Sequence, residues 1–250
     1  MMNNTVNILG IDFLNTTINN FINTLHSHLE DRKKAFVVTA NPEVVMKARK
    51  EEDFMSVIKN ADYVTADGIG IIKSAGLLGL PLPERVTGFD LTLRLLSLAN
   101  EKNYSVYLLG GRDKVIEKAS ETIETEYPNV TIAGYHHGFF DLNDDKIAST
   151  IEHIKPDIVL VALGAGRQEA WINQHLSRFE HGIFMGVGGT FDVLAGEVQR
   201  APEVWQRMNL EWFYRLVKQP SRWKRQIALP QFALKVLQVK MQQIAKVPVR

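Results

Sequence analysis

The chain has 250 residues, of which 45% are hydrophobic, and its formal net charge at pH 7 is +1. This apolar content suits one large domain, or one domain with an appendage. The absence of cysteine excludes disulfide bonds, thiolate nucleophiles and cysteine-bound zinc. We expect neither a signal peptide nor a transmembrane helix, because the first residues lack a basic segment and no apolar run approaches ~20 residues.

Apolar runs typical of buried strands alternate with amphipathic helical patterns over the first 196 residues. A helical pattern follows each predicted strand, and these strands are 34–40, 61–66, 104–111, 129–136, 156–166 and 181–189. The alternation indicates an α/β fold with a mostly parallel, Rossmann-like sheet and helices on both faces. Ligands of such sheets bind beyond the carboxyl ends of the strands. Polar and glycine-rich residues at those ends are therefore the candidate site.

The segment after Gly196 has a different pattern, with no clear strand. It predicts helices that break near three prolines, Pro202, Pro220 and Pro230. We therefore expect two units, an α/β domain at 1–196 and a basic helical appendage at 197–250. From Arg200 onward the chain carries eleven basic and two acidic side chains, a charge of +9 against −8 for the preceding residues. This asymmetry indicates an anionic partner or, more simply, a solvated basic helix.

The appendage is also partly apolar, because tryptophan, phenylalanine and leucine side chains interleave with its lysines and arginines. This composition is typical of a helix that lies in an anionic membrane surface. The same side chains would equally pack against the main domain or against a second copy of the chain in a homodimer. Binding of nucleic acid by the basic tail is a more distant alternative, and it predicts strongly salt-dependent binding.

Two strand ends place polar residues before a helix. Thr39 and Asn41 precede Pro42, so Asn41 is either a plain helix cap or, with Thr39, a group that holds ligand oxygens. Asp67 follows the next strand, in the stretch TADGIG. It is either another helix cap or a carboxylate that projects into the cleft and acts as a general base. Adjacent strand ends would bring these three side chains together.

Further along, Arg85 lies in a loop, where its planar fork suits a phosphate or sugar oxygen. Three glycine-rich strand ends, LLGGRD, LGAGRQE and GVGGTFD, would let a nucleotide or diphosphate approach the backbone closely.

The sequence has neither a D-x-D triplet nor a G-x-x-x-x-G-K-[ST] loop, so neither a carboxylate-held metal nor ATP hydrolysis is indicated. A departing diphosphate would then need cations or helix N-termini, and the tail offers Arg215, Arg222 and Arg225.

Taken in series, these motifs resemble a known family. In order they are T-A-N-P-E, A-D-G-x-G, R-V-T-G-x-D, L-G-G, G-x-x-x-Q-E-x-W, G-V-G-G-x-F-D-x-L-A-G, R-A-P and L-E-W-x-Y-R-L. Each is weak alone, but together, from about Val6 to about Arg225, they resemble the WecG/TagA/CpsF glycosyltransferases. One position departs from the pattern, since family members often carry proline where this chain has Gly166.

The resemblance implies an inverting transferase that uses no cofactor or metal and is peripheral on the cytoplasmic face of a bacterial plasma membrane. The closest-looking branch moves N-acetylmannosamine from UDP-N-acetylmannosamine to the 4-hydroxyl of N-acetylglucosamine-diphospho-undecaprenol, a step in teichoic acid linkage-unit synthesis. A related branch transfers N-acetylmannosaminuronic acid, whose extra carboxylate would require an extra cation in the sugar pocket. Nucleic acid is not an expected partner under this resemblance.

The resemblance also implies roles for particular residues. Asp67 would be the base that takes the proton of the acceptor hydroxyl. The acceptor and donor pocket would be lined by Thr39, Asn41, Arg85 and Gln168. The nucleoside would be contacted by the glycine-rich stretch with Gly188, Gly189 and Asp192. The diphosphate would be covered by three arginines of the appendage, Arg215, Arg222 and Arg225.

Overall fold

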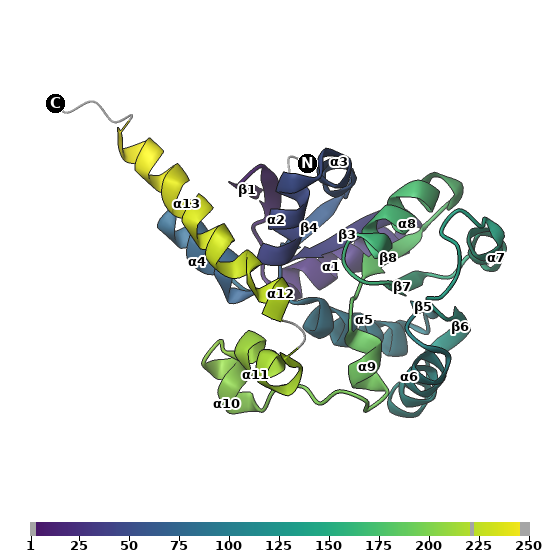
Figure 1. Cartoon of the computed structure of the whole chain (residues 1–250). Helices are drawn as coiled ribbons and strands as arrows, with labels where there is room; N and C mark the ends of the chain where they lie inside the picture. The colour runs from purple at the N-terminus through teal and green to yellow at the C-terminus, as the bar shows by residue number, and fades with distance from the viewer. Residues whose placement is uncertain (1–3, 221–222, 246–250) are drawn as a thin grey trace.

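The computed structural model describes residues 4–220 and 223–245, and its centre is a six-stranded parallel sheet (Figure 1). The strand order is β4-β3-β8-β7-β5-β6, and every neighbouring pair is parallel. All six predicted strands form, so the predicted α/β fold is confirmed. The strands are β3 (Lys34–Ala40), β4 (Tyr63–Ala66), β5 (Ser105–Gly110), β6 (Thr131–His136), β7 (Ile158–Ala162) and β8 (Gly182–Gly186).

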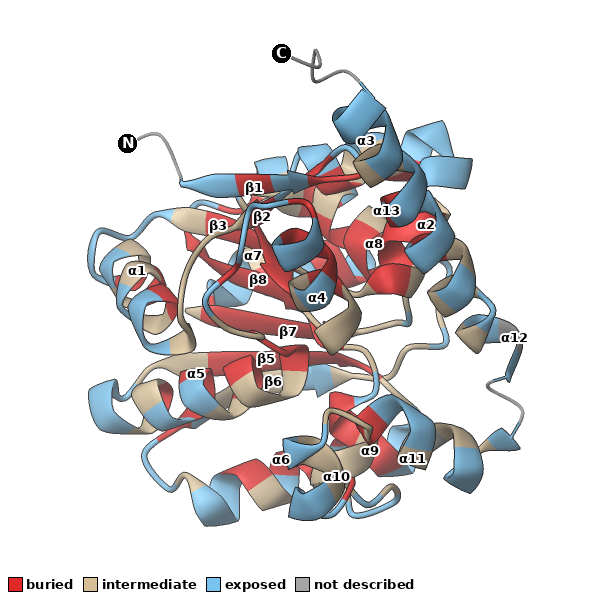
Figure 2. Ribbon diagram, turned by 90° about the vertical axis from the view of Figure 1, so that its left-hand side faces the viewer, coloured by how far each residue is buried: buried red, intermediate tan, exposed pale blue. Residues whose placement is uncertain are grey.

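Helices cover both faces of the sheet and bury its strands (Figure 2). β3 shows why its sequence is a continuous apolar run: Phe36 and Val38 face one hydrophobic cluster, and Ala35 and Val37 face the other. The first cluster includes residues of α2 (Pro42–Lys50), α3 (Glu52–Lys59), α7 (Lys146–Ile154) and α8 (Arg167–His175), which a 3-10 turn, η1 (Leu176–Arg178), extends. The second includes residues of α1 (Ile18–Glu30), α5 (Gly88–Lys102) and α6 (Asp113–Glu126).

The chain starts with an antiparallel hairpin that its sequence pattern did not reveal. β1 (Thr5–Ile8) pairs with β2 (Ile11–Leu14) across a turn in which Leu9 and Gly10 have φ of 53° and 93°. Alternate residues of both strands are buried in the same cluster as α4 (Ile69–Leu77). Positive φ at both turn residues is typical of a tight hairpin, but Leu-Gly is a much weaker signal for it than Asn-Gly.

Beyond β8 the described residues continue in helices, as predicted for this part of the chain. α10 begins directly after Pro202, and α11 ends before Pro220. A break also occurs near Pro230, because one helix ends at Gln226 and the next, α13, begins at Ala228 and runs through Pro230. Pro230 occupies the first turn, where a backbone N–H has no partner within the helix to lose. The helices are α9 (Thr190–Leu194), α10 (Glu203–Arg207), α11 (Glu211–Lys218), α12 (Trp223–Gln226) and α13 (Ala228–Ala245).

The last helix, α13, packs against α2 and α4 and divides its apolar residues into two sets (Figure 1). Phe232 and Val236 are buried in the main core. Leu234, Leu237 and Met241 are between 47% and 68% exposed. Packing on the main domain therefore accounts for one side of this helix, while a membrane role for the other side stays a prediction, as does the division of the chain at residue 196. No helix among the described residues is both long and apolar enough to cross a bilayer.

Candidate active site

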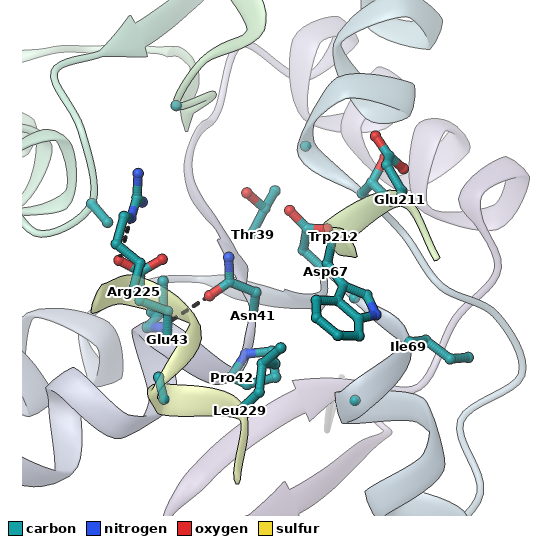
Figure 3. Close-up of a pocket in the computed structure, with 18 of the residues that line it drawn as sticks. Thr39, Asn41, Pro42, Glu43, Asp67, Ile69, Glu211, Trp212, Arg225 and Leu229 are labelled. Atoms are coloured by element: carbon teal, nitrogen blue, oxygen red, sulfur yellow. Dashed lines mark hydrogen bonds and ion pairs between the residues drawn. The ribbon is translucent and has the colours of Figure 1, made fainter. Parts of the chain in front are cut away.

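A cavity of about 900 Å³ opens at the carboxyl edge of the sheet (Figure 3). Residues that follow four neighbouring strands, β4, β3, β8 and β7, line it, and α11, α12 and α13 contribute the rest of the wall. Parallel strands end at the same edge, so segments distant in sequence meet there. Nine predicted site residues line the cavity, namely Thr39, Asn41, Asp67, Arg85, Gln168, Gly188, Gly189, Asp192 and Arg225. Of the other two, Arg215 belongs to α11 with its side chain not described, and Arg222 lies outside the described residues.

Asp67 follows β4, and its side chain lies in the cavity beside Thr39 and Trp212 (Figure 3). Its backbone N–H donates to the carbonyl oxygen of Ala40 at 3.0 Å, which fastens the end of β4 to the end of β3. The N-cap of α4 is Gly68, with φ of 113°, and this helix has no side-chain cap. Asp67 is therefore not the N-cap, and its carboxylate belongs to the wall of the cavity.

Thr39 and Asn41 lie at the end of β3, on the strand next to that of Asp67. Asn41 caps α2, because its side-chain oxygen accepts a hydrogen bond from the Val44 N–H at 3.1 Å. Its amide nitrogen points into the cavity (Figure 3), so the cap leaves a donor for a ligand. The Thr39 hydroxyl donates to the carbonyl oxygen of Gly186 at 3.4 Å, which ties β3 to β8. Both interpretations of Asn41, cap and cavity residue, are thus compatible.

Gln168 is buried at the start of α8 and connects two glycine-rich loops. Its Oε1 accepts a hydrogen bond from the Gly188 N–H at 3.1 Å, and its Nε2 donates to Glu169 Oε1 at 2.8 Å. These two contacts fix the orientation of the amide and leave one N–H for a ligand. A Cβ at Gly186 would overlap with the Gln168 amide, so any other residue at this point of β8 would force the Gln168 side chain to move.

Glu169 is only 1% exposed and also accepts a hydrogen bond from the Gly166 N–H. Burial raises the pKa of this carboxyl group, while its hydrogen bonds and the nearby Lys47 ammonium lower it. Gly166 has φ of 95°, and Lys47 fills the space that a side chain there would need. Proline has φ near −65° and no N–H, so this loop takes a shape that a proline at the same position would not allow.

Two of the predicted anion-binding arginines form ion pairs that the sequence did not reveal. Arg85 lies 3.6 Å from Glu211 of α11, and Arg225 donates from Nε to Glu43 of α2 at 2.7 Å. Each pair joins the appendage to the α/β domain at the wall of the cavity. Both glutamates stand in the motifs T-A-N-P-E and L-E-W, but opposite charges far apart in a sequence give no sign that they will meet.

Arg200, the first residue of the R-A-P motif, attaches the start of the appendage to α5. Its Nη2 donates to Asp90 Oδ1 at 2.6 Å, and its guanidinium lies 4.7 Å from the centroid of the Phe89 ring. Asp90 is held in turn by Thr87, whose hydroxyl donates to it at 2.7 Å and caps α5. Phe89 and Thr87 line the cavity, so Arg200 supports the cavity wall through its contacts with Phe89 and Asp90 without lining the cavity itself.

One of the three glycine-rich strand ends lies apart from the cavity. Gly110 and Gly111, at the end of β5, are absent from the described lining residues, and the Gly111 N–H donates to the carbonyl oxygen of Ala162. The other two glycine-rich ends, LGAGRQE and GVGGTFD, contribute Gly164, Gly188 and Gly189 to the cavity lining. Among the described residues no three histidine, aspartate or glutamate side chains gather into a group that could hold a metal ion.

An α/β protein with carboxylate, amide and guanidinium groups around one large cavity at the strand ends has the architecture of a ligand-binding α/β enzyme. The model of the glycosyl transferase WecG/TagA/CpsF family matches residues 6–246. The chain therefore belongs to this family of glycosyltransferases.

Individual relatives resemble the chain over nearly its whole length. It is 38% identical over 234 residues to the N-acetylglucosaminyldiphosphoundecaprenol N-acetyl-beta-D-mannosaminyltransferase of Bacillus subtilis (strain 168), a match that covers 93% of this chain and 91% of the relative. It is 36% identical over 237 residues to the protein of the same name from Staphylococcus aureus (strain MW2), with 94% and 93% covered.

Proposed function

We propose that this protein transfers N-acetylmannosamine from UDP-N-acetylmannosamine to the 4-hydroxyl of N-acetylglucosamine-diphospho-undecaprenol, with inversion at the anomeric carbon. The names of the relatives supply the sugar and the lipid-linked acceptor. The observation that carries the mechanism is the position of Asp67 in the cavity wall beside Thr39 at the end of β3, in a cavity that Gln168 also lines. The product is a teichoic acid linkage-unit intermediate, and the protein acts on the cytoplasmic face of the membrane.

The reaction is a single displacement. The acceptor hydroxyl gives its proton to Asp67, its oxygen bonds to the anomeric carbon, and the bond from that carbon to the UDP oxygen breaks. Thr39 and Asn41 orient the sugars, and Asp192 with Gly188 and Gly189 contacts the nucleoside. Arg225, together with Arg215 and Arg222, receives the charge of the leaving diphosphate, while Arg85 holds the sugar or its phosphate. No metal is required by this scheme.

Asp67→Asn tests the base assignment. Asparagine has almost the same shape but cannot accept the proton, so turnover should fall by about 10²–10⁴-fold. The thermal midpoint of unfolding and the affinity for UDP should stay close to those of the parent protein. Turnover within about tenfold of the parent, with both controls unchanged, would remove Asp67 from this role.

The choice of donor has a direct test. N-acetylmannosaminuronic acid carries a carboxylate that needs a cation in the sugar pocket. The names of the relatives favour the uncharged sugar. Assays with the two UDP sugars side by side should show transfer of N-acetylmannosamine only.

We also propose that the exposed side of α13 contacts an anionic membrane. Leu234, Met241 and Ile244 are each more than 60% exposed, and lysines lie between them along the helix. Replacing these three residues with glutamine should weaken sedimentation with phosphatidylglycerol vesicles by about tenfold, because apolar burial and charge act together. The matched control is Phe139→Gln, which removes an apolar side chain that is 71% exposed on a distant loop. Equal loss in both variants, or none in either, would refute the membrane role.

A further inference from the structure

The charges around the cavity single out one lysine. Among the described residues that line it, the cations are Lys73, Arg85 and Arg225. The two arginines are neutralised by glutamates, at 3.6 Å and 2.7 Å. Lys73 has no ion pair or hydrogen bond with any described residue, and it is exposed. Among the described lining residues it is therefore the cation that forms no ion pair with a described glutamate or aspartate.

The position of Lys73 along α4 relates it to Asp67. The helix begins at Ile69, two residues after Asp67, and Lys73 lies one turn further, about 6 Å along the axis. Leu77 lies another turn beyond Lys73, and all of these residues line the same cavity. Residues four apart share one side of a helix. α4 thus presents to the cavity a carboxylate before its first turn, then an ammonium group, then an apolar side chain.

Beyond Lys73 the cavity wall becomes apolar. α13 packs against α4 and contributes further apolar residues to the cavity lining, and these are Leu229, Phe232, Ala233, Val236 and Leu237. Leu77 and Leu237 are 43% and 47% exposed, so the apolar wall reaches the surface of the molecule. A ligand that fits this wall has a hydrocarbon part that leaves the cavity between α4 and α13.

We propose that α4 and α13 form a subsite for a polyprenyl diphosphate, in which Lys73 binds the diphosphate of the acceptor and the apolar wall takes its first isoprene units. This inference rests on the proposed function. The order of groups in such an acceptor is a hydroxyl on the sugar, the sugar ring, the diphosphate and then the hydrocarbon chain. It is the same order in which Asp67, Lys73 and Leu77 follow one another along the wall.

The same diphosphate chemistry occurs in the nucleotide-sugar donor, so the test must separate the two sources. Binding of three probes is measured by titration calorimetry with the whole protein: farnesyl diphosphate, farnesol and UDP. Lys73→Gln should weaken farnesyl diphosphate by about 10- to 100-fold, the loss expected for one charge-assisted contact. It should leave farnesol and UDP within about twofold of the parent protein. Lys73→Arg should retain most of the affinity.

A matched control is Lys114→Gln, which removes an exposed lysine at the start of α6, outside the cavity lining. This variant should bind all three probes as the parent does. An equal loss of farnesyl diphosphate and farnesol in Lys73→Gln would mean that Lys73 acts only by packing and would overturn the proposal. A selective loss of UDP would assign Lys73 to the donor instead, and a parent protein that fails to bind farnesyl diphosphate would also overturn it.

These measurements need no turnover, so the subsite and the proposed function fail separately. Selective, Lys73-dependent binding of farnesyl diphosphate by a protein that transfers no N-acetylmannosamine would refute the activity and leave the subsite standing. If the protein transfers the sugar but its Lys73→Gln variant binds farnesyl diphosphate as the parent does, the activity stands and the subsite is refuted. In an active protein, the acceptor KM of Lys73→Gln should rise about 10- to 100-fold while the donor KM stays unchanged.

Discussion

Gly186→Ala is a one-methyl change that tests how the candidate site is held in place. Gly186 ends β8, and a Cβ there would overlap with the Gln168 amide and lie 2.9 Å from its Cδ. Gln168 must then move and lose its bonds to the Gly188 N–H and to Glu169. One neutral hydrogen bond and one to a buried carboxylate correspond to about 2–4 kcal/mol of unfolding free energy. For a chain of this size the thermal midpoint should fall by roughly 5–15 °C.

The assay is thermal unfolding combined with UDP affinity, and the chain offers a matched control. Gly76→Ala adds the same methyl group within α4, where a Cβ would meet nothing within 4 Å, so stability should stay equal or rise by up to about 1 kcal/mol. In a Gln168→Ala background Gly186→Ala should be nearly neutral, because the side chain in its way has gone. If Gly186→Ala lowers the unfolding free energy equally in the Gln168→Ala background and in the parent protein, or lowers it in neither, the contact with Gln168 does not determine the effect.

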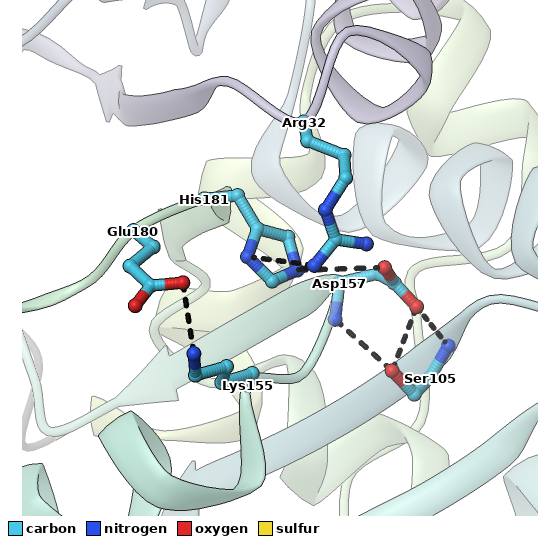
Figure 4. Close-up of polar contacts among 6 residues, drawn as sticks. All are labelled: Arg32, Ser105, Lys155, Asp157, Glu180 and His181. Carbon is cyan, nitrogen blue, oxygen red and sulfur yellow. Dashed lines mark hydrogen bonds and ion pairs between the residues drawn. The ribbon is translucent and has the colours of Figure 1, made fainter.

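Two buried groups give stability opposite dependences on pH. His181 lies at the amino edge of the sheet with Arg32 Nη2 3.2 Å from its Nε2 (Figure 4), and burial followed by Arg32 lowers its pKa below the usual 6.5. As the pH falls, the unfolded chain therefore binds this proton before the folded chain does, so the free energy of unfolding decreases below pH 6.5. In urea unfolding, His181→Gln should reduce the slope of unfolding free energy against pH by up to about 1.4 kcal/mol per pH unit. The pKa of Glu169 is raised in the folded chain, so the unfolded chain loses this proton first as the pH rises. The free energy of unfolding therefore decreases above pH 4.5, and Glu169→Gln should remove this decrease. A variant of either buried group that keeps the pH slope of the parent protein would contradict the sign or the origin assigned here.

The sheet was predictable because its strands are buried on both faces. β3, β5, β7 and β8 read as continuous apolar runs, and such runs between helical patterns have few other structures available. The N-terminal hairpin was missed because its strands have four residues and its turn is Leu9-Gly10. The break near Pro230 lies three residues earlier, between α12 and α13, because a sequence shows a proline but not the turn of the helix in which it falls, and Pro230 lies in the first turn of α13.

The sequence by itself determined where polar groups follow buried strands, and parallel strands with short loops leave them one common edge. Nine of the eleven predicted residues accordingly line one cavity. Only the tertiary structure decided which charges form ion pairs. The appendage folds back onto the α/β domain and so brings Glu211 to Arg85 and Arg225 to Glu43, which their spacing in the sequence does not indicate. It also decided which side of α13 is covered and that Lys73 lies between a carboxylate and an apolar wall. Burial and ion pairing depend on which elements pack together, and that choice is made by the whole chain.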